Sequence, residues 1–408
     1  MERELRALFF AAFLPFWAQW LQDQVNAMDA QQSPPPGYRR AGRRSRHAQG
    51  FFGWTTLERD YYYNGRRGFS PADGRLGLVG SYTPDLACLL TLAAALEPYE
   101  AAQQLLKRFS GIAVAGRQIQ RLIQIVGPKA LAWQRPTAPV QAMPVLYLSF
   151  DGTGVPIVNR ELRGRKGKPP DGTAKTREAK LGCAFTQHGQ DEKGHPVRDP
   201  DSTTYVASFQ TAREFGALMR QEALRRGMAV AAKVGVICDG AKWTAELARV
   251  NFPGALFILD FYHALLHLHA LAEALEGKET PGKARLVSQW KKLLLQDRVQ
   301  QVIAQAQRLG QSRPAQQEAI QQEIGYLVNH QAWMLYKTYR KAGYFIGSGV
   351  VEAGCKTVVG QRLKGSGMHW TEEGALHVLA LRCLVLSGLF ETFWSDFVSG
   401  LSADAANG

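Results

Sequence analysis

Three acidic residues stand where a sheet and a helix would bring their carboxylates together. Asp151 follows the apolar run 145–150, and Asp239 follows a second apolar run, 234–238. Glu352 opens a predicted helix directly after a glycine-rich turn. Carboxylate oxygens suit hard cations such as Mg²⁺, and two such ions about 4 Å apart can clamp the attacking and leaving oxygens of phosphoryl transfer. An aspartate followed by glycine is also a common turn or helix cap, so only the convergence of all three acids would indicate catalysis.

The elements around these acids follow the order of a mixed α/β sheet. The patterns predict strands at 145–154, 180–186 and 203–209, a helix at 212–226, a strand at 234–239, a helix at 242–250 and a strand at 256–260. Three successive strands predict an antiparallel meander, and the later alternation predicts parallel crossovers onto the same sheet. That order is the layout of a ribonuclease H-like core.

Helical patterns complete this core. The segment 262–338 is rich in glutamine and leucine and has two proline-containing breaks, which predicts an α-helical insertion. A glycine-rich turn at 343–349 then leads into the glutamate helix, 350–359, and a last apolar helix is predicted at 371–393.

The first part of the chain joins an apolar helix to a basic segment. The run 7–21 is almost entirely apolar, but it is too short to span a bilayer and contains Pro15, so we expect a docking helix or a wrongly assigned start of the chain rather than an export signal. Residues 31–50 contain three prolines and five arginines, which predicts a basic linker, either a solvated loop or an arm that contacts phosphates. Short strands and turns are expected at 51–78.

Three helix-length patterns follow, at 86–96, 99–109 and 115–126. Proline, serine and glycine separate them where helices are expected to stop, which gives a helix-turn-helix-like layout. In the third helix, Arg117, Gln118 and Arg121 present guanidinium and amide groups opposite an apolar side, as a helix that reads a DNA groove must. An ordinary three-helix bundle fits the same pattern.

The composition favours a folded protein with a polyanionic partner. The 408 residues are 46% hydrophobic, and a chain of this length is expected to form at least two domains. Lys and Arg total 49 against 35 acidic residues, a net charge of +14, so nucleic acid is the first partner to consider and an anionic membrane the second. Five scattered cysteines without a CxxC pair support neither a disulfide framework nor a cysteine zinc site.

Five ordered motifs give the sequence a specific resemblance to a known family. They are DGTGVP at 151–156, TREAKLG at 176–182, CDGAKW at 238–243, DFYH at 260–263 and GSGVVE at 347–352. These segments look like those of bacterial insertion-sequence transposases of the ISKra type, in the Mutator-like DDE group of the ribonuclease H-like superfamily. The resemblance extends from about Tyr61 to about Leu386 and includes GQRLKGSGMHW at 360–370.

The resemblance implies a function in DNA transposition. It places a catalytic and metal-binding triad on Asp151, Asp239 and Glu352, with Mg²⁺ or Mn²⁺ as cofactor, and implies cleavage at the ends of an insertion sequence followed by strand transfer. The expected partners are the double-stranded DNA of element ends and target, and further copies of the chain. No membrane and no small-molecule substrate is expected, and the expected location is the bacterial cytoplasm, at the nucleoid. Asp260 and His263 match a family signature, with DNA handling or local structure as the expected role.

Basic residues gather where the resemblance would place DNA. The first group follows Asp151 and comprises Arg160, Arg163, Arg165, Lys166, Lys168, Lys175, Arg177 and Lys180. Arg362, Lys364 and Trp370 follow the glutamate, and together with His263 they complete the expected DNA contacts. A solvated basic loop is the alternative for the first group. Zinc binding by the histidines near 263 is not favoured, because structural zinc sites usually use cysteine.

One departure from the family concerns the N-terminal region. Relatives often carry a cysteine-based zinc element after the tyrosine run, whereas residues 63–69 contain no cysteine. We expect this element to fold without metal, or this copy to be impaired in end recognition. Two other functions stay open: a non-catalytic DNA-binding protein, as a decayed transposase or a regulator, and a hydrolytic ribonuclease H-like nuclease that cleaves without joining.

The expected fold is α/β, with a ribonuclease H-like core that has a mixed β-sheet and an α-helical insertion, preceded by a mainly helical, helix-turn-helix-like DNA-binding region. The expected parts are an apolar helix and basic linker (1–50), a small β/turn element (51–83), the DNA-binding region (84–140), the first part of the core (141–262), the insertion (263–342), and the completion of the core with the C-terminal helices (343–408).

Overall fold

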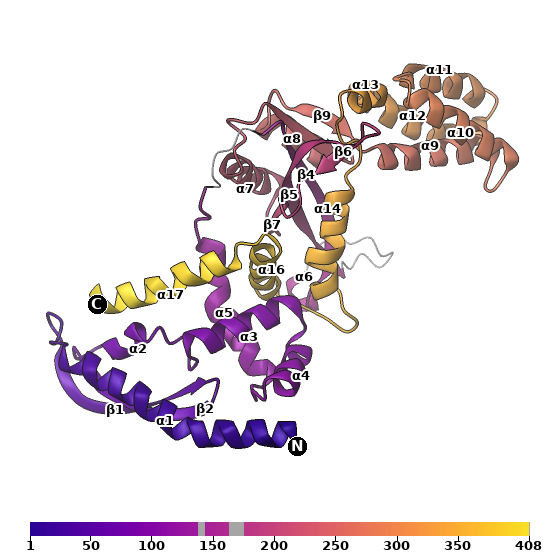
Figure 1. Ribbon diagram of the computed structural model, residues 1–408. Coiled ribbons are helices and arrows are strands. Elements are labelled where there is room, and N and C mark those ends of the chain that lie inside the picture. Colours follow the sequence, from indigo (N-terminus) through magenta and orange to yellow (C-terminus); the bar gives the residue numbers. More distant parts are fainter. Residues whose placement is uncertain (138–142, 163–174, 408) are drawn as a thin grey trace. The chain divides into compact units, whose positions relative to one another are not determined.

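The computed structural model describes residues 1–137, 143–162 and 175–407 and divides into two compact units (Figure 1). The terminal unit comprises Met1–Gln134 and Trp370–Gly408, and the central unit comprises Arg135–His369. Residues 343–408, which the sequence placed together, are thus divided between the two units at Trp370.

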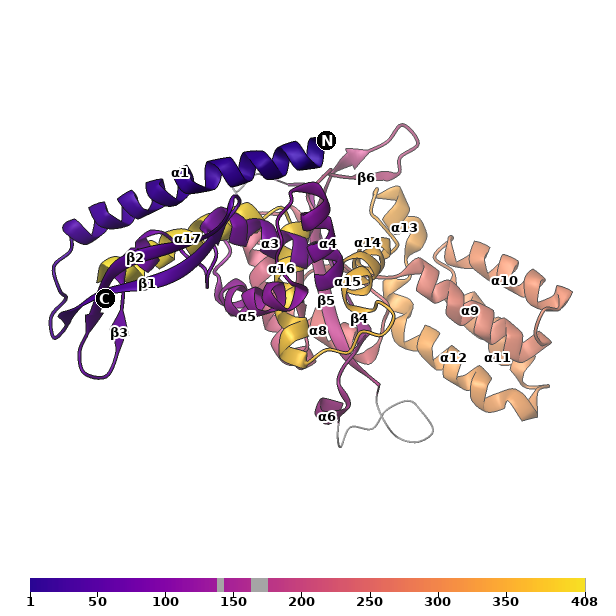
Figure 2. The same cartoon turned by 90° about the horizontal axis from the view of Figure 1, so that it is seen from below.

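The terminal unit begins with a long helix that lies along an antiparallel sheet. Its first elements are α1 (Glu2–Ala30), β1 (Arg39–Gly50), β2 (Gly53–Tyr63), β3 (Gly68–Phe69) and α2 (Pro71–Arg75). β2 pairs with both β1 and β3, and α1 packs against β2 (Figures 1 and 2). Leu21 and Val25 of α1 join Ala48 and Leu57 of the strands in one buried cluster. The apolar helix expected at 7–21 is confirmed, and one of its faces docks on the unit's own sheet.

The prediction of a basic linker at 31–50 is wrong over most of its length, because β1 occupies its second part. Acidic groups on neighbouring elements compensate the arginines of this strand. Arg40 Nη2 lies 2.6 Å from Asp60 Oδ1, and Arg46 pairs with Asp73. The composition of the segment alone does not reveal these partners, which let the strand form despite its charge.

A tight turn joins β2 to β3 in the segment that lacks cysteine. Asn64 Oδ1 accepts hydrogen bonds from the main-chain N–H groups of Arg66 and Arg67, at 3.0 and 2.7 Å. Gly65 adopts a φ of +89°, a conformation that favours glycine. Side-chain capping therefore closes this hairpin. The strands expected within 51–78 are present, but β2 is long, and part of the expected turn sequence forms α2.

Helices complete the terminal unit. They are α3 (Pro84–Leu96), α4 (Tyr99–Phe109), α5 (Gly116–Ala132), α16 (Glu372–Leu386) and α17 (Phe390–Asn407). The first three confirm the expected helices, although α5 continues through Pro128 to Ala132, beyond the expected end at 126. Packing of α5 against α3 and α16 outweighs the one helical hydrogen bond that the proline removes. The single helix expected at 371–393 is interrupted, and Gly388 at the break has a φ of +66°.

A mixed β-sheet forms the middle of the central unit. Its strands are β4 (Val145–Pro156), β5 (Thr176–Gln190), β6 (Pro196–Arg198), β7 (Thr204–Ser208), β8 (Lys233–Cys238) and β9 (Leu256–Leu259). β5 pairs antiparallel with β4, β6 and β7, whereas β8 lies parallel to both β4 and β9. This arrangement confirms the expected meander followed by parallel crossovers, so the unit is α/β with a mixed sheet. The short β6 was not expected, because three residues are too few to show alternation.

Two helices, α7 (Ala212–Arg225) and α8 (Lys242–Asn251), pack on the same face of this sheet. Leu148 and Phe150 of β4 form one buried cluster with Phe215 of α7 and Leu247 of α8. Side chains alternate along a strand, so the odd-numbered residues of β4, including Asp151, point to the opposite face. A short helix, α6 (Asn159–Leu162), follows β4.

A helical segment follows β9. Its elements are α9 (Phe261–Glu276), α10 (Pro281–Leu294), α11 (Val299–Gly310), η1 (Pro314–Gln316), α12 (Gln317–His330), η2 (Gln331–Trp333) and α13 (Tyr336–Lys341). Helices α9 to α12 lie side by side in both views (Figures 1 and 2) and enclose the fully buried Trp290. The break before α10 lies where expected, because Thr280 caps that helix and Pro281 begins it. The helical segment predicted at 262–338 is therefore confirmed.

The predicted glutamate helix is a continuous run of three helical pieces. They are α14 (Gly349–Gly354), the π-helical segment η3 (Cys355–Gly360) and α15 (Gln361–Leu363). A π-helical turn widens the helix locally and is frequent at functional sites.

No single helix in the described part of the chain is long and apolar enough to cross a membrane. Helices α16 and α17 meet the length and composition criteria only when joined, and they bend by 118° at the break between them.

Candidate active site

Asp151 of β4 and Asp239, which directly follows β8, lie at the same level of the sheet. β4 and β8 pair in parallel with Ser149 opposite Ile237, so each aspartate comes two residues after a paired position. Adjacent strands lie about 4.8 Å apart, and alternation places the Asp151 side chain on the face away from α7 and α8. The strand that carries Asp151 continues past it, because pairing with β5 extends to Pro156. The fully buried part of β4, rather than the strand itself, ends before Asp151.

Glu352 reaches this region from the first turn of α14. Ser348 precedes the helix, and its Oγ donates a hydrogen bond to Glu352 Oε1 at 2.9 Å. α14 packs against β4 and β5. At Gly354 a Cβ atom would lie 2.9 Å from Leu181 Cδ2 of β5, so glycine allows the glutamate helix to approach the sheet closely.

Asp151 and Glu352 line one pocket of about 420 Å³. Its other lining residues are Thr153, Cys355, Lys356, Gly360 and Lys364. The Nζ of Lys364 donates to Thr153 Oγ1, which links the end of the glutamate helix to β4. Two carboxylates beside two ammonium groups can hold a cation next to an anionic phosphate.

The charge state of Asp151 reflects its acidic neighbours. Burial raises the pKa of the Asp151 carboxyl, and the negative charges of Asp239 and Glu352 raise it further. Hydrogen bonds from the Gly152 N–H, at 2.6 Å, and from the Cys355 thiol act in the opposite direction. Asp151 therefore interacts electrostatically with both of the other predicted acids, and a bound cation would relieve that repulsion.

Asp239 also has a structural role. Its Oδ1 accepts hydrogen bonds from the Ala241 N–H at 3.0 Å and from the Thr244 hydroxyl at 2.7 Å. Gly240 in this turn has a φ of +79°, and Tyr326 of α12 donates to the main-chain oxygen of Asp239 at 2.7 Å. Because the turn uses Oδ1, the capping role and the expected metal-binding role are compatible at one residue.

The described residues do not form a closed metal site. Within these parts of the chain, no three His, Cys, Asp or Glu side chains come close enough together to hold a metal ion. The donor set still fits Mg²⁺ or Mn²⁺, because hard oxygen ligands from Asp151 and Glu352 face one pocket. His267, by contrast, hydrogen-bonds Glu323 through Nδ1 at 2.6 Å and stacks on Tyr326.

Two basic residues expected to contact DNA are buried. Lys180 is 9% exposed, and its Nζ lies 3.0 Å from Glu178 Oε2 and 5.6 Å from the centroid of the Trp243 ring. Arg362 is fully buried within the helical run that carries Glu352. The geometry does not favour direct phosphate contact by either side chain, and residue type alone does not reveal their burial.

The other predicted contacts of the central unit lie in different places. Lys364 is exposed and lines the pocket, whereas Arg177 donates a hydrogen bond to the main-chain oxygen of Phe209 at 3.0 Å. His263 lies in the first turn of α9. Four basic residues lie outside the described residues: Arg163, Arg165, Lys166 and Lys168.

In the terminal unit, α5 presents the residues expected to read DNA. Arg117 and Arg121 are exposed, whereas Gln118 caps the N-terminus of its own helix through Oε1. Trp370 packs edge-on against Tyr99, with ring centroids 6.2 Å apart. The two arginines are therefore available to a ligand, while Gln118 and Trp370 have structural contacts.

Two residues that line the pocket, Cys355 and Lys356, were not among the site residues predicted from the sequence. The Cys355 thiol hydrogen-bonds Asp151, and burial raises the pKa of this thiol. Lys356 is exposed beside it. Both lie about one helical turn after Glu352, and that spacing was the signal available in the sequence.

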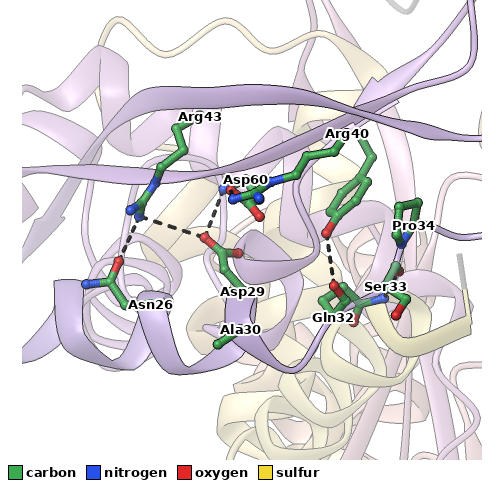
Figure 3. A pocket seen from close by; sticks show the side chains of 10 residues that line it. Asn26, Asp29, Ala30, Gln32, Ser33, Pro34, Arg40, Arg43 and Asp60 are labelled. Atoms are coloured by element: carbon green, nitrogen blue, oxygen red, sulfur yellow. Dashed lines mark hydrogen bonds and ion pairs between the residues drawn. The ribbon is translucent and has the colours of Figure 1, made fainter.

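A second pocket, of about 480 Å³, lies in the terminal unit between the end of α1 and the β1–β2 hairpin. Figure 3 shows Arg40 beside Asp60 and Arg43 directed toward Asp29, with N–O distances of 2.6 and 3.9 Å. Burial raises the pKa of Asp29. Acids and arginines alternate around this pocket, so its charges largely compensate one another and connect α1 to the hairpin.

No protein-family model matches this chain, and no curated protein sequence matches it. The functional argument therefore depends on the sequence motifs and on the geometry of the acidic site.

Proposed function

We propose that this chain is a DDE-type DNA transposase similar to the ISKra type of bacterial insertion-sequence transposases. The observation that carries the proposal is the level placement of Asp151 on β4 and of Asp239 directly after the parallel strand β8, with Glu352 in the same pocket as Asp151. The antiparallel meander followed by parallel strands supports a ribonuclease H-like core with a helical insertion.

The proposed chemistry is phosphoryl transfer on double-stranded DNA. Asp151, Asp239 and Glu352 would hold Mg²⁺ or Mn²⁺, which when bound stabilises the charge that develops on the scissile phosphate. Lys356 and Lys364 attract the phosphate from the rim of the pocket. The transferred end is the freed 3′-hydroxyl, as the resemblance implies.

The proposed partners are the DNA ends of the element, the target DNA and further copies of the chain. Exposed Arg117 and Arg121 on α5 and the net charge of +14 support DNA binding. Because two element ends must be processed together, an oligomer is proposed. A protein of this kind would act in the bacterial cytoplasm, on the nucleoid.

The test is a cleavage and strand-transfer assay on labelled duplexes that carry the terminal repeats flanking the gene, with Mg²⁺ or Mn²⁺. Wild type is compared with Asp239→Asn, which keeps the Oδ1 acceptor of the turn but removes the charge. The matched control is Asp191→Asn, because Asp191 Oδ1 caps a comparable turn through the N–H groups of Lys193 and His195. Wild type and the control should cleave and join, and Asp239→Asn should only bind.

Other results of this assay would support one of the two alternative functions. Binding without cleavage by wild type in either metal would favour a non-catalytic DNA-binding protein. Cleavage without joined products would favour a hydrolytic nuclease. Loss of binding by Asp239→Asn would indicate a folding defect, which circular dichroism would reveal.

A further inference from the structure

Asp260 is a fully buried carboxylate at the junction of three segments of the central unit. It begins α9, where its Oδ1 accepts a hydrogen bond from the His263 N–H at 2.5 Å. Its Oδ2 accepts a hydrogen bond from the Ser348 N–H, at the start of the glutamate helix. The two oxygens of Asp260 thus accept from two main-chain donors, His263 and Ser348, that are far apart from each other in sequence. Hydrogen bonds to a charged acceptor are stronger than those between neutral groups.

The main chain around Asp260 connects the two halves of the acidic site. The Asp260 N–H donates to the carbonyl oxygen of Cys238 at 2.8 Å, and Cys238 directly precedes Asp239. The next N–H, of Phe261, donates to the carbonyl oxygen of Ile346 at 2.9 Å. The start of α9 is therefore fixed both to the strand end that carries Asp239 and to the turn that leads into α14.

The contact continues from Ser348 to the third acid. Ser348 is 6% exposed; its N–H is held by Asp260 and its hydroxyl donates to Glu352 Oε1 at 2.9 Å. Nearby, Gly347 approaches the Tyr262 ring so closely that a Cβ would lie 2.9 Å from Cε2, which leaves the turn little room to move. One carboxylate oxygen of Glu352 is thus oriented by a hydroxyl whose own backbone is held by a buried acid.

We propose that Asp260 is a positioning residue. It sets the direction of the Glu352 carboxylate through Ser348 and fixes the position of that carboxylate relative to Asp239. This inference rests on the proposed metal-dependent function. Asp260 does not line the pocket and acts only through these hydrogen bonds. Partners that orient a metal ligand in this way typically change metal affinity or activity about 10- to 100-fold when they are lost.

Two substitutions interrupt the contact at different points. Asp260→Asn leaves one acceptor oxygen for two N–H donors, so one of them loses its partner. Ser348→Ala removes only the hydroxyl that reaches Glu352, whereas Ser348→Thr keeps it. The control is Thr280→Ala, which removes the N-cap of α10, in the same helical segment, without touching an acid.

The experiment titrates Mn²⁺ alone into the full chain, followed by electron paramagnetic resonance, and measures kcat and KM for DNA cleavage in parallel. Asp260→Asn and Ser348→Ala should bind Mn²⁺ about tenfold more weakly and lose kcat while KM for DNA stays unchanged. Ser348→Thr should have the Mn²⁺ affinity of wild type. Thr280→Ala should lower the melting temperature and leave the Mn²⁺ affinity unchanged.

Wild-type affinity and kcat in both Asp260→Asn and Ser348→Ala would overturn the positioning role and leave the proposed function intact. Failure of Ser348→Thr to restore affinity would also overturn it, because loss would then follow from packing. If wild type itself neither binds Mn²⁺ nor cleaves DNA, the proposed function fails and this inference fails with it. If Asp260→Asn does not fold, the comparison of Ser348→Ala with Ser348→Thr still tests the positioning role.

Discussion

A buried and a half-buried carboxylate of the central unit, Glu222 and Asp151, have opposite electrostatic surroundings. Burial alone would raise the pKa of Glu222, but Arg225 and Arg135 hold it below its ordinary value. Glu222 bonds Arg225 at 2.5 Å and Thr204 at 2.5 Å. Burial also raises the pKa of Asp151, where the neighbouring charges belong to Asp239 and Glu352 and have the same sign.

The difference separates a structural acid from a candidate catalytic one. A buried acid that is compensated by arginine stabilises its surroundings and has no need of a ligand. Acids that repel one another destabilise the fold slightly, and such an arrangement persists where a ligand compensates it. The acidic site at Asp151 is of the second kind, so it is the better candidate for a cation site.

The largest expected effect is on catalysis. Asp151→Asn should reduce the DNA cleavage rate by at least about a thousandfold, because a metal ligand that provides several kcal/mol of charge stabilisation is lost. The rate is measured under single-turnover conditions with saturating Mn²⁺. Glu222→Gln should cleave at the wild-type rate per folded molecule. Equal losses in the two variants would erase the proposed difference between the two carboxylates.

The second effect is on folding. Glu222→Gln should lower the free energy of unfolding by about 3 kcal/mol, because it leaves buried arginines without their counter-charge. Urea titration followed by circular dichroism measures this change. Glu246→Gln, at an exposed position of α8, is the control and should be close to wild type. A stability of Glu222→Gln equal to that control would show that the pair is not structural.

The pH dependence should have opposite signs at the two sites. The raised pKa of Asp151 means that the folded state binds its proton more tightly. Ionisation of Asp151 therefore costs stability above its folded pKa, and this cost vanishes below the ordinary aspartate pKa of 3.8. The lowered pKa of Glu222 contributes stability that is fully present above the ordinary glutamate pKa of 4.5 and is lost as pH falls through the folded pKa.

Unfolding free energies of Asp151→Asn and wild type, compared across acidic to neutral pH without divalent metal, test this sign. The variant should be the more stable protein at neutral pH, and the advantage should disappear in acid. An advantage that grows as the pH falls would refute the assignment. Mg²⁺ should stabilise wild type and leave Asp151→Asn largely unaffected.

The smallest effect concerns one phosphate contact. Lys364→Gln should weaken DNA binding and reduce the slope of log affinity against log salt by about 1, as expected for one lost phosphate contact. Lys180→Gln should leave that slope unchanged, because Lys180 is buried against Glu178. Fluorescence anisotropy over a salt series distinguishes the two. A reduced slope in Lys180→Gln would show that the Lys180 side chain contacts DNA after all.

Local signals predicted much of the fold. The alternation of apolar strands and helices from 145 to 260, the three helices before it and the breaks in the helical segment depend on hydrophobic period, glycine and proline, which act over a few residues. Those signals failed at the arginine-rich segment of β1, because its partners Asp60 and Asp73 lie on other elements.

The candidate site shows the same limit. Motif and element order placed Asp151, Asp239 and Glu352 near the ends of apolar segments, and the structure brings them within electrostatic reach. The roles of Cys355 and Lys356 were not visible, because their contribution depends on how the helix packs on β4. The burial of Lys180 and Arg362, which were expected to contact DNA, was not visible in the sequence for the same reason.

The sequence by itself determined which residues form strands and helices in the sheet region and which acids follow them, because those choices depend on neighbouring residues. Only the tertiary structure decided which charges are compensated. Electrostatic energy depends on distance through space, and the chain brings Glu222 to Arg135 and Asp151 to Glu352 from far apart in sequence. The same is true of Asp260, whose connection to Glu352 exists only once β8, α9 and α14 have packed together.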